Sequence, residues 1–208
     1  MKIKAALVRE EGAPFTIEDV ELEAPRAGEL QVKIVACGVC HTDAKAQGGY
    51  FTPFPAVLGH EGAGIVEKVG ESVTDFQVGD HVVLSYPYCC ECDNCKKHKP
   101  YYCYRSTELS FFGKFKDGHT PLSQNGAPVN SFFGQSSFAT HAIVPVVNAV
   151  KVDKDVDLKL LAPLGCGVQT GAGAIINALR PEPADSVVIF GTGTVGLSGI
   201  MGAATIGC

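Results

Sequence analysis

The 208-residue chain has no tryptophan, only two methionines, and charged residues at just 19% of its composition. Acidic residues exceed basic ones by 22 to 17, and the net charge of −5 argues against a bulk electrostatic partner such as DNA or an anionic membrane surface. With 46% hydrophobic residues, the composition is that of a globular protein. Disorder, collagen-like repeats and coiled coil are therefore excluded as descriptions of the whole chain, and we expect neither a nucleic-acid nor a membrane partner.

The chain also lacks a long apolar leader. Lysines at positions 2 and 4 and charged residues at 9–11 interrupt the N-terminal apolar run, whereas a secretory signal needs a longer one, so we expect a cytoplasmic protein. One uncharged stretch, residues 186–208, is long enough to span a bilayer. Because it contains six glycines, we expect a buried strand, turn and helix there instead.

Glycine, by contrast, is abundant, at 24 residues, and indicates many tight turns. In the first 150 residues, short runs rich in valine and isoleucine alternate with Gly, Pro and Asp turns. This spacing predicts a barrel-like or sandwich β domain. The expected strands are Ile3–Val8, Phe15–Val20, Glu29–Ala36, Ala63–Val69, His81–Ser85 and Phe138–Val144. Between Pro87 and Asn130 the strand signal disappears.

The character of the chain changes near residue 155. Leu158–Leu164 and Val168–Leu179 have a helical pattern, and Val187–Phe190 is a short β-branched run that predicts a strand. A helix-like tail follows it. The sequence therefore predicts a mixed α/β protein, with a β domain over 1–155 and a second part over 156–208.

Four cysteines form a compact motif, Cys89-x2-Cys92-x2-Cys95-x7-Cys103. A structural zinc is held by four such ligands in a tetrahedron, and two-residue spacers let one turn present successive thiolates. Disulfides fit poorly in a chain without an export signal. Buried free thiols and a nucleic-acid zinc ribbon are the competing interpretations. Because four ligands complete the site, we interpret Cys90 as a cysteine that does not bind the metal.

A second group of metal-ligating residues is spread along the chain. Cys40 follows a predicted strand, and His60 and Glu61 open another. A catalytic zinc has three protein ligands, and Cys166 is a candidate for the third. A lone Cys or His is more often a core residue, and the spacing does not show that positions 40, 60 and 166 meet.

The glycines of Gly191-x-Gly193-x2-Gly196 follow a predicted strand and open a predicted helix. In this context they suggest a dinucleotide-binding turn: the first glycine permits the turn, the second lets the backbone approach a pyrophosphate, and the third allows close packing. The acidic residue that would follow about 20 residues later lies beyond Cys208. A glycine-rich packing turn is the alternative.

Together these motifs resemble the zinc-dependent medium-chain alcohol dehydrogenases, and within them the aryl-alcohol (benzyl alcohol) dehydrogenases. The resemblance covers essentially the whole chain. It rests, in order, on Gly38–Asp43, Gly59–Glu61, the four cysteines of 89–103, Phe132–Ala139, Leu164–Gly171 and Gly191–Gly196.

The resemblance implies a GroES-like β domain over 1–155 with a zinc lobe at 87–104, and the beginning of a Rossmann domain over 156–208. It implies one structural zinc on the four cysteines and one catalytic zinc. The catalytic zinc would be held by Cys40, His60 and Cys166, with Glu61 beside it and able to exchange with a ligand.

The resemblance also implies an activity, the oxidation of a primary, aromatic alcohol to its aldehyde with NAD or NADP. Asp43 would orient His60, and the Thr42 hydroxyl would hydrogen-bond the alcohol oxygen. His41 would lie near the cofactor pyrophosphate, while Thr170 and Val195 would flank the cofactor. Gly191, Gly193 and Gly196 would form its binding turn.

Two departures from the family pattern stand out. Many members place a relay histidine five residues after the first zinc cysteine, where this chain has Lys45. Family chains also continue with the rest of the Rossmann sheet and are dimers or tetramers, so we expect an N-terminal fragment that binds zinc without turnover. The alternatives are a dehydrogenase of S-(hydroxymethyl)glutathione or aliphatic alcohols, and a short non-catalytic zinc-binding module.

Overall fold

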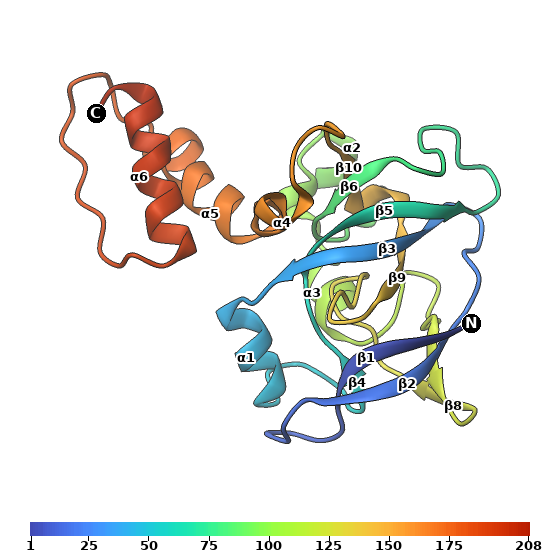
Figure 1. The fold of residues 1–208 in the computed structure, drawn as a ribbon. Coiled ribbons are helices and arrows are strands. Elements are labelled where there is room, and N and C mark those ends of the chain that lie inside the picture. The colour runs from blue at the N-terminus through green and yellow to red at the C-terminus, as the bar shows by residue number, and fades with distance from the viewer. The chain divides into compact units, whose positions relative to one another are not determined.

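The computed structural model describes residues 1–208, which divide into two compact units, Met1–Ala162 and Pro163–Cys208. The first unit contains two five-stranded sheets (Figure 1). The first sheet has the order β4 (Ala56–Val57), β1 (Lys2–Val8), β2 (Thr16–Leu22), β7 (Leu122–Gln124) and β8 (Ala127–Val129). The second has the order β10 (Ala149–Lys151), β6 (His81–Leu84), β5 (Glu61–Val69), β3 (Glu29–Gly38) and β9 (His141–Pro145).

The helices of the first unit are short. They are α1 (His41–Gln47), α2 (Asp93–Lys96), α3 (Ser106–Phe111) and α4 (Leu158–Leu161), with 3-10 turns η1 (Pro100–Tyr102) and η2 (Val146–Asn148). A third such turn, η3 (Ala162–Gly165), follows α4. The second unit is helical, with α5 (Gly167–Gly173), the π-helical turn η4 (Ala174–Leu179) and α6 (Thr194–Ile206).

Alternating side chains build the core between these strands. In β1 the side chains of Ile3, Ala5 and Leu7 are buried, as the two-residue period of a strand with one covered face requires. The second sheet buries Leu30 and Val32 of β3 against its neighbours. The antiparallel pairing of β3 with β5 runs from Leu30↔Val69 to Gly38↔Glu61, and this register brings the end of β3 beside the start of β5.

All six strands expected from the sequence are present, with ends shifted by a few residues. The expectation of no strand between Pro87 and Asn130 was wrong, because β7 and β8 form a hairpin there. Its turn is Asn125-Gly126, and both residues have positive φ, which is the backbone that an Asn-Gly hairpin turn favours.

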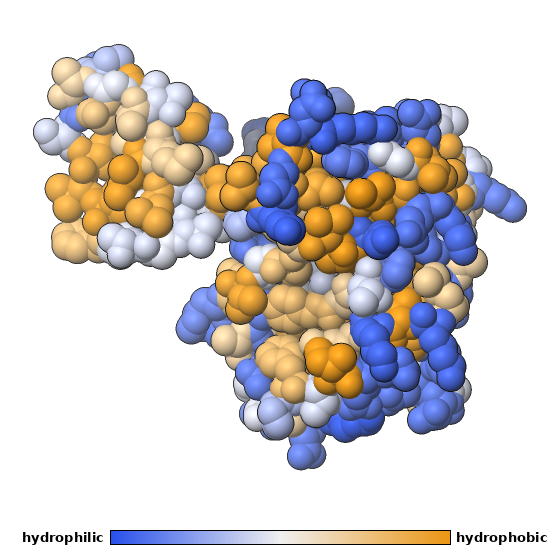
Figure 2. All heavy atoms as spheres, viewed as in Figure 1, coloured by the Kyte–Doolittle hydropathy of each residue, from blue (hydrophilic) through white to orange (hydrophobic).

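The boundary between the units and the start of the second unit also differ from the sequence expectation. The chain divides after Ala162 rather than after residue 155, because Leu158 of α4 packs in a hydrophobic cluster of the first unit. The expected strand Val187–Phe190 is not formed. A strand needs a pairing partner, and here Val188 and Phe190 are 76% and 94% exposed. Figure 2 shows hydrophobic residues grouped on the visible face of this unit.

The uncharged stretch 186–208 forms an irregular segment followed by the 13-residue helix α6. No single helix of the chain is long and apolar enough to cross a membrane. The segments Leu158–Gly165 and Gly167–Leu179 meet the length and composition criteria only when taken together, as a bent pair.

Candidate metal centres

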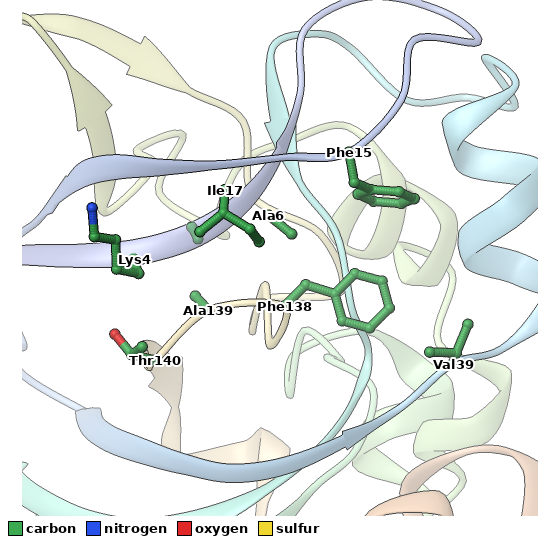
Figure 3. Close-up of a pocket in the computed structure, with 9 residues that line it drawn as sticks. Lys4, Ala6, Phe15, Ile17, Val39, Phe138, Ala139 and Thr140 are labelled. Carbon is green, nitrogen blue, oxygen red and sulfur yellow. The ribbon is translucent and has the colours of Figure 1, made fainter.

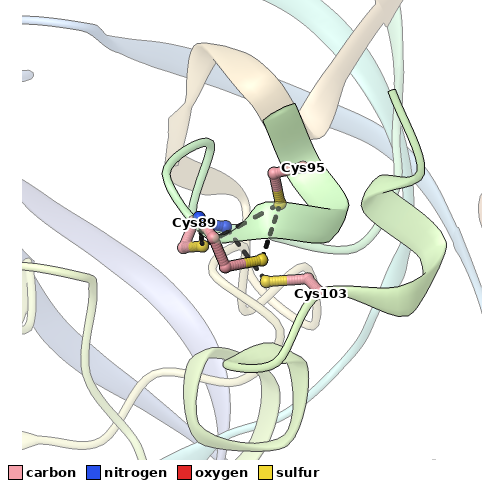
Figure 4. A group of neighbouring side chains, drawn as sticks. Cys89, Cys95 and Cys103 are labelled. Carbon is pink, nitrogen blue, oxygen red and sulfur yellow. Dashed lines mark hydrogen bonds between the residues drawn. The ribbon is translucent and has the colours of Figure 1, made fainter. Parts of the chain in front are cut away.

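The sulfur atoms of the four lobe cysteines converge on one point. The ligand atoms of Cys89, Cys92, Cys95 and Cys103 all lie within 4.8 Å of one another (Figure 4). The sulfur of Cys95 is 3.9 Å from that of Cys89 and 3.5 Å from that of Cys92. Zinc–sulfur bonds of about 2.3 Å give a tetrahedron with edges of about 3.8 Å, so the four thiols fit a structural zinc.

Backbone N–H groups support these sulfurs. The N–H of Cys92 donates to the sulfur of Cys89, and the N–H of Cys89 donates to that of Cys103, both at 3.3 Å. Backbone N–H groups of Cys95 and Tyr104 lower the pKa of Cys92 to about 6, so that its thiolate is available at neutral pH. None of the four forms a disulfide.

The remaining cysteine of this segment, Cys90, is exposed and lies outside the group of ligands. A positive charge that approaches the lobe is that of Lys116. Its ammonium donates to the carbonyl of Cys89 at 2.9 Å and pairs with Glu91 at 2.7 Å.

A second group of ligands lies in the first unit where β3 ends and β5 begins. Cys40 stands between β3 and α1, while His60 and Glu61 lie at the start of β5. The pairing of Gly38 with Glu61 brings the two strand ends together. As a result, the ligand atoms of Cys40, His60 and Glu61 lie within 4.8 Å of one another.

Asp43 fixes this arrangement through three hydrogen bonds. Its Oδ1 lies 3.0 Å from Nδ1 of His60 and accepts from the backbone N–H of Gly59 at 3.1 Å. Its Oδ2 accepts from the backbone N–H of Cys40 at 3.0 Å. The Asp43 side chain is buried, and it binds both chain segments that supply ligands, as the partners of metal-ligating histidines commonly do.

The imidazole of His60 presents one nitrogen toward the ligand group. Nε2 is buried and has no hydrogen-bond partner, which is unusual for a polar atom and fits a metal ligand. Burial alone would lower the pKa of His60, but the hydrogen bond with Asp43 and the negative charges of Asp43 and the neighbouring Cys40 raise it to about 9. The ring of Phe133 stacks on the imidazole at 4.6 Å and holds its plane.

The position of the Glu61 carboxylate requires a residue without a side chain opposite it. A Cβ atom on Gly38 would lie 2.0 Å from Oε2 of Glu61, so glycine at position 38 leaves room for the carboxylate. The carboxylate is buried, at 4% exposure for the residue. A thiol, an imidazole and a carboxylate together form a donor set that suits zinc.

The first residues of α1 complete this part of the site. His41 is exposed and Thr42 is half-buried, directly after Cys40. Lys45, five residues after Cys40, points its ammonium toward the ring of Tyr50, 5.9 Å from the ring centroid.

The other predicted site residues belong to the second unit. Cys166 directly precedes α5, and its carbonyl accepts a hydrogen bond from the Thr170 hydroxyl at 2.7 Å. Whether Cys166 joins Cys40 and His60 stays a prediction, because the structure describes the two units separately.

The glycine-rich turn has the backbone that its sequence predicts. Gly191 has a φ of +101°, which favours glycine, and Gly193 is the residue before the first turn of α6. A Cβ on Gly196 would lie 2.0 Å from the carbonyl oxygen of Gly191, so this glycine permits the close approach of helix and turn. Val195 is exposed beside them.

Two residues around His60 were not singled out from the sequence. Phe133 packs on its ring, and Gln135 hydrogen-bonds its carbonyl. Both lie in the loop 132–138. The run Phe132–Ala139 that contains them carries part of the family resemblance, but the sequence assigns no role to either residue.

Aromatic side chains gather beside this loop. The ring of Phe111 lies 5.1 Å from that of Phe133 and 6.3 Å from that of Phe51, and Tyr50 contacts both Phe51 and Phe111. Phe115, by contrast, packs in the core of the first sheet.

A separate apolar groove of about 590 Å³ lies between β1, β2 and residues 138–140 (Figure 3). The rings of Phe15 and Phe138 meet edge to face across it, with centroids 5.8 Å apart. Lys4 is the only charged residue in its lining, so the groove offers packing surface but no catalytic group.

Comparisons with known proteins agree with this geometry. Residues 26–154 match the family model of the alcohol dehydrogenase GroES-like domain. Among curated relatives, a geraniol dehydrogenase of Castellaniella defragrans is 48% identical over 98% of this chain, and an S-(hydroxymethyl)glutathione dehydrogenase of Escherichia coli is 40% identical. The chain spans 55% and 56% of the length of these two relatives.

Solved structures show the same likeness. An alcohol dehydrogenase zinc-binding domain protein from Burkholderia ambifaria aligns over the whole chain with a TM-score of 0.96 and 47% identity. A benzyl alcohol dehydrogenase from Acinetobacter calcoaceticus aligns with a TM-score of 0.94 and 48% identity. The aligned region covers 57% and 56% of those two chains.

Proposed function

This chain belongs to the family of alcohol dehydrogenases with a GroES-like domain, and from that premise we propose that the full-length protein is a zinc-dependent dehydrogenase of primary alcohols. The observation that carries the proposal is the buried, unpartnered Nε2 of His60 beside the Cys40 sulfur, with Nδ1 bound to Asp43. When bound, zinc supplies a Lewis acid that lowers the pKa of an alcohol, and NAD supplies the hydride acceptor.

The residues of the first unit prepare this chemistry. Asp43 holds the imidazole so that Nε2 faces the ligand group, and the Phe133 ring shields one side of it from water. The Thr42 hydroxyl, two residues after Cys40, would hydrogen-bond the alcohol oxygen and receive its proton. His41 is exposed next to it and would pass that proton outward, since Lys45 is turned toward Tyr50.

The second unit would contribute the third ligand and the cofactor site. We assign the third ligand to Cys166, on the basis of the family resemblance of Leu164–Gly171. The turn Gly191–Gly196 leads into α6, whose first backbone N–H groups have no carbonyl acceptor within the helix. Such a helix N-terminus favours the binding of a pyrophosphate. Thr170 and Val195 would flank the cofactor.

For the substrate we propose a primary alcohol next to an aromatic or allylic carbon. The rings of Phe51, Phe111 and Phe133 form a continuous aromatic surface that reaches the imidazole of His60. The names of two relatives support the same choice, since they are dehydrogenases of geraniol and of benzyl alcohol at 48% identity. S-(hydroxymethyl)glutathione is the second candidate, favoured by the relative named for that substrate, which is 40% identical.

The test is a comparison of kcat/KM for the full-length protein with benzyl alcohol, geraniol, ethanol and S-(hydroxymethyl)glutathione, each with NAD and NADP. We expect the highest values with benzyl alcohol or geraniol and NAD. Highest activity with the glutathione adduct would replace the proposed substrate by the second candidate. A full-length protein with two bound zinc ions and no turnover of any alcohol would contradict the enzymatic proposal.

The role of His41 has its own test. His41→Ala should weaken cofactor binding and change the alkaline limb of the pH–rate profile. An unchanged profile together with unchanged cofactor affinity would remove His41 from the proton path.

A further inference from the structure

Gln135 is a buried polar side chain that the proposed chemistry does not use. Its residue is 1% exposed, and all four hydrogen-bonding positions of its amide are occupied. Nε2 donates to the carbonyl of His60 at 3.0 Å and to that of Ser85 at 2.9 Å. Oε1 accepts from the backbone N–H of Gly62 at 3.2 Å and from the hydroxyl of Ser137 at 2.7 Å.

These partners fix the orientation of the amide. Two carbonyl oxygens face its nitrogen, and an N–H and a hydroxyl face its oxygen, so the reversed amide would lose its pairing on both sides. Gly62 makes the contact possible, because a Cβ there would lie 2.2 Å from the Ser137 hydroxyl oxygen. The side chain therefore brackets the backbone on both sides of Glu61.

The backbone of the same loop pairs with the segment that leads into β5. The N–H of Ser137 donates to the carbonyl of Gly59 at 2.9 Å, and the N–H of Phe138 donates to that of Leu58 at 3.0 Å. Gly59 has a φ of +91° and comes close to the loop, since a Cβ on it would lie 2.4 Å from the nitrogen of Phe138. The chain around His60 is thus tied to loop 132–138 at successive positions.

His60 is consequently held at three places. Asp43 binds Nδ1, the Phe133 ring covers one face of the imidazole, and Gln135 binds the main-chain carbonyl. Fixing that carbonyl restricts the backbone dihedrals that set the direction of the side chain. Metal ligands need such support, because small displacements of a donor atom weaken the site.

We propose that Gln135 is a positioning residue for the His60 metal ligand, acting through the backbone of His60 and Gly62. This inference rests on the proposed function, because it needs a metal on Nε2 of His60. It assigns to loop 132–138 a second task besides packing, since the loop then determines where Nε2 points.

The test uses the full-length protein with cobalt(II) in place of zinc, with the visible spectrum and the rate of metal release to a chelator as readouts. Subtracting the spectrum of a Cys40→Ser variant removes the contribution of the four-cysteine lobe. Gln135→Met keeps the shape and removes all four hydrogen bonds. Gln135→Glu keeps the acceptor oxygen but loses the amide donor to His60 and Ser85.

We expect Gln135→Met to alter the cobalt spectrum of the His60 site and to release that metal at least about tenfold faster, while the lobe metal stays bound. Gln135→Glu should also alter the spectrum and speed the release of this metal, and it replaces the Met variant in the test if that variant is insoluble. Gln31→Leu is the matched control, because Gln31 is equally buried, at 2% exposure, in β3. It should lower the melting temperature without changing the spectrum.

The outcomes are distinguishable. A parent protein with two cobalt ions, combined with Gln135 variants of parental spectrum and release rate, would overturn this inference alone. A parent protein that binds cobalt only in the lobe would overturn the proposed function, and this inference with it.

Discussion

The two candidate metal centres are built in opposite ways. The lobe takes its four ligands from one segment, 89–103. Little apolar packing supports it, because Leu109 is the one buried residue in its hydrophobic cluster besides Cys89 and Cys103. The site at Cys40 and His60 takes its ligands from the ends of two paired strands, and buried hydrogen bonds fix them. The lobe should thus depend on its metal for its shape, whereas the other site depends on the protein for its shape and uses the metal for chemistry.

The largest expected effect is the loss of the lobe metal. Structural zinc contributes folding free energy directly, about 10 kcal/mol or more in small zinc domains. We expect Cys92→Ser to remove one zinc per chain and to lower the melting temperature by more than about 10 °C. Calorimetry and metal analysis test this, with Cys90→Ser as the control because Cys90 is exposed and outside the group. Equal stability of the two variants would contradict the claim that the lobe depends on its metal for its shape.

Asp43→Asn should affect the other site and spare the lobe. The variant loses the carboxylate that serves His60, Gly59 and Cys40, so metal affinity there should fall about 10- to 100-fold. We expect stability to fall by about 1–3 kcal/mol, because an NH2 group replaces one of the two acceptor oxygens and the buried N–H that faces it loses its acceptor. Dialysis against a chelator followed by metal analysis measures the effect. Asp19→Asn, on the exposed side chain that pairs with Lys4, should change neither quantity.

Gly38→Ala should affect the same site by steric conflict, without removing a hydrogen bond. The added Cβ would lie 2.0 Å from Oε2 of Glu61, so the carboxylate must move. We expect a stability loss of about 1–3 kcal/mol and a smaller loss of metal affinity than in Asp43→Asn. Gly48→Ala is the control, because its φ is −77° and the nearest atom would be 3.5 Å away. If the two alanine variants match in stability and metal content, Glu61 is not confined by Gly38.

The smallest expected effect lies far from both centres, at Glu18. Hydrogen bonds from Thr16, Gln124 and Arg9 lower its pKa from 4.5 to about 2. A lowered pKa in the folded state stabilises the fold above about pH 4.5, and this contribution disappears as the pH falls through about 2. Because the cluster is on the surface, Glu18→Gln should cost little at neutral pH, and the difference from the parent should vanish in acid.

Denaturant titrations of both proteins from pH 7 to pH 2 test this expectation. A difference that grows as the pH falls would contradict the assigned sign. Metal release should occur at higher pH than the loss of this cluster, because protons compete with zinc for thiolate and imidazole.

Sequence reasoning succeeded where the information is local. The spacing of Cys89, Cys92, Cys95 and Cys103 predicts a compact group of thiols, and their sulfurs do converge. The short runs rich in valine and isoleucine predict six of the ten strands, and β1 shows the alternation of exposed and buried residues expected of a strand with one covered face. The left-handed backbone of Gly191 likewise follows from its place in a glycine turn.

Sequence reasoning failed where a partner distant in the chain decides the structure. The run Val187–Phe190 has strand propensity, but no strand lies beside it. The three-residue strands of the hairpin β7–β8 are too short to show a pattern, and only Asn125-Gly126 marked them. Gln135 looks like a surface residue in the sequence, and its role depends on three other segments folding around it.

The hydrogen bonds of Asp43 have a consequence for how the protein acquires its metal. All three partners are protein atoms, so the bonds that align Cys40 and His60 do not require any particular ion. An imidazole beside a soft thiolate binds cobalt, nickel and copper ions as well as zinc, and copper more tightly. Discrimination among these ions is therefore left to the supply of metals in the cell that makes the protein, and material produced in a different medium should carry a different ion.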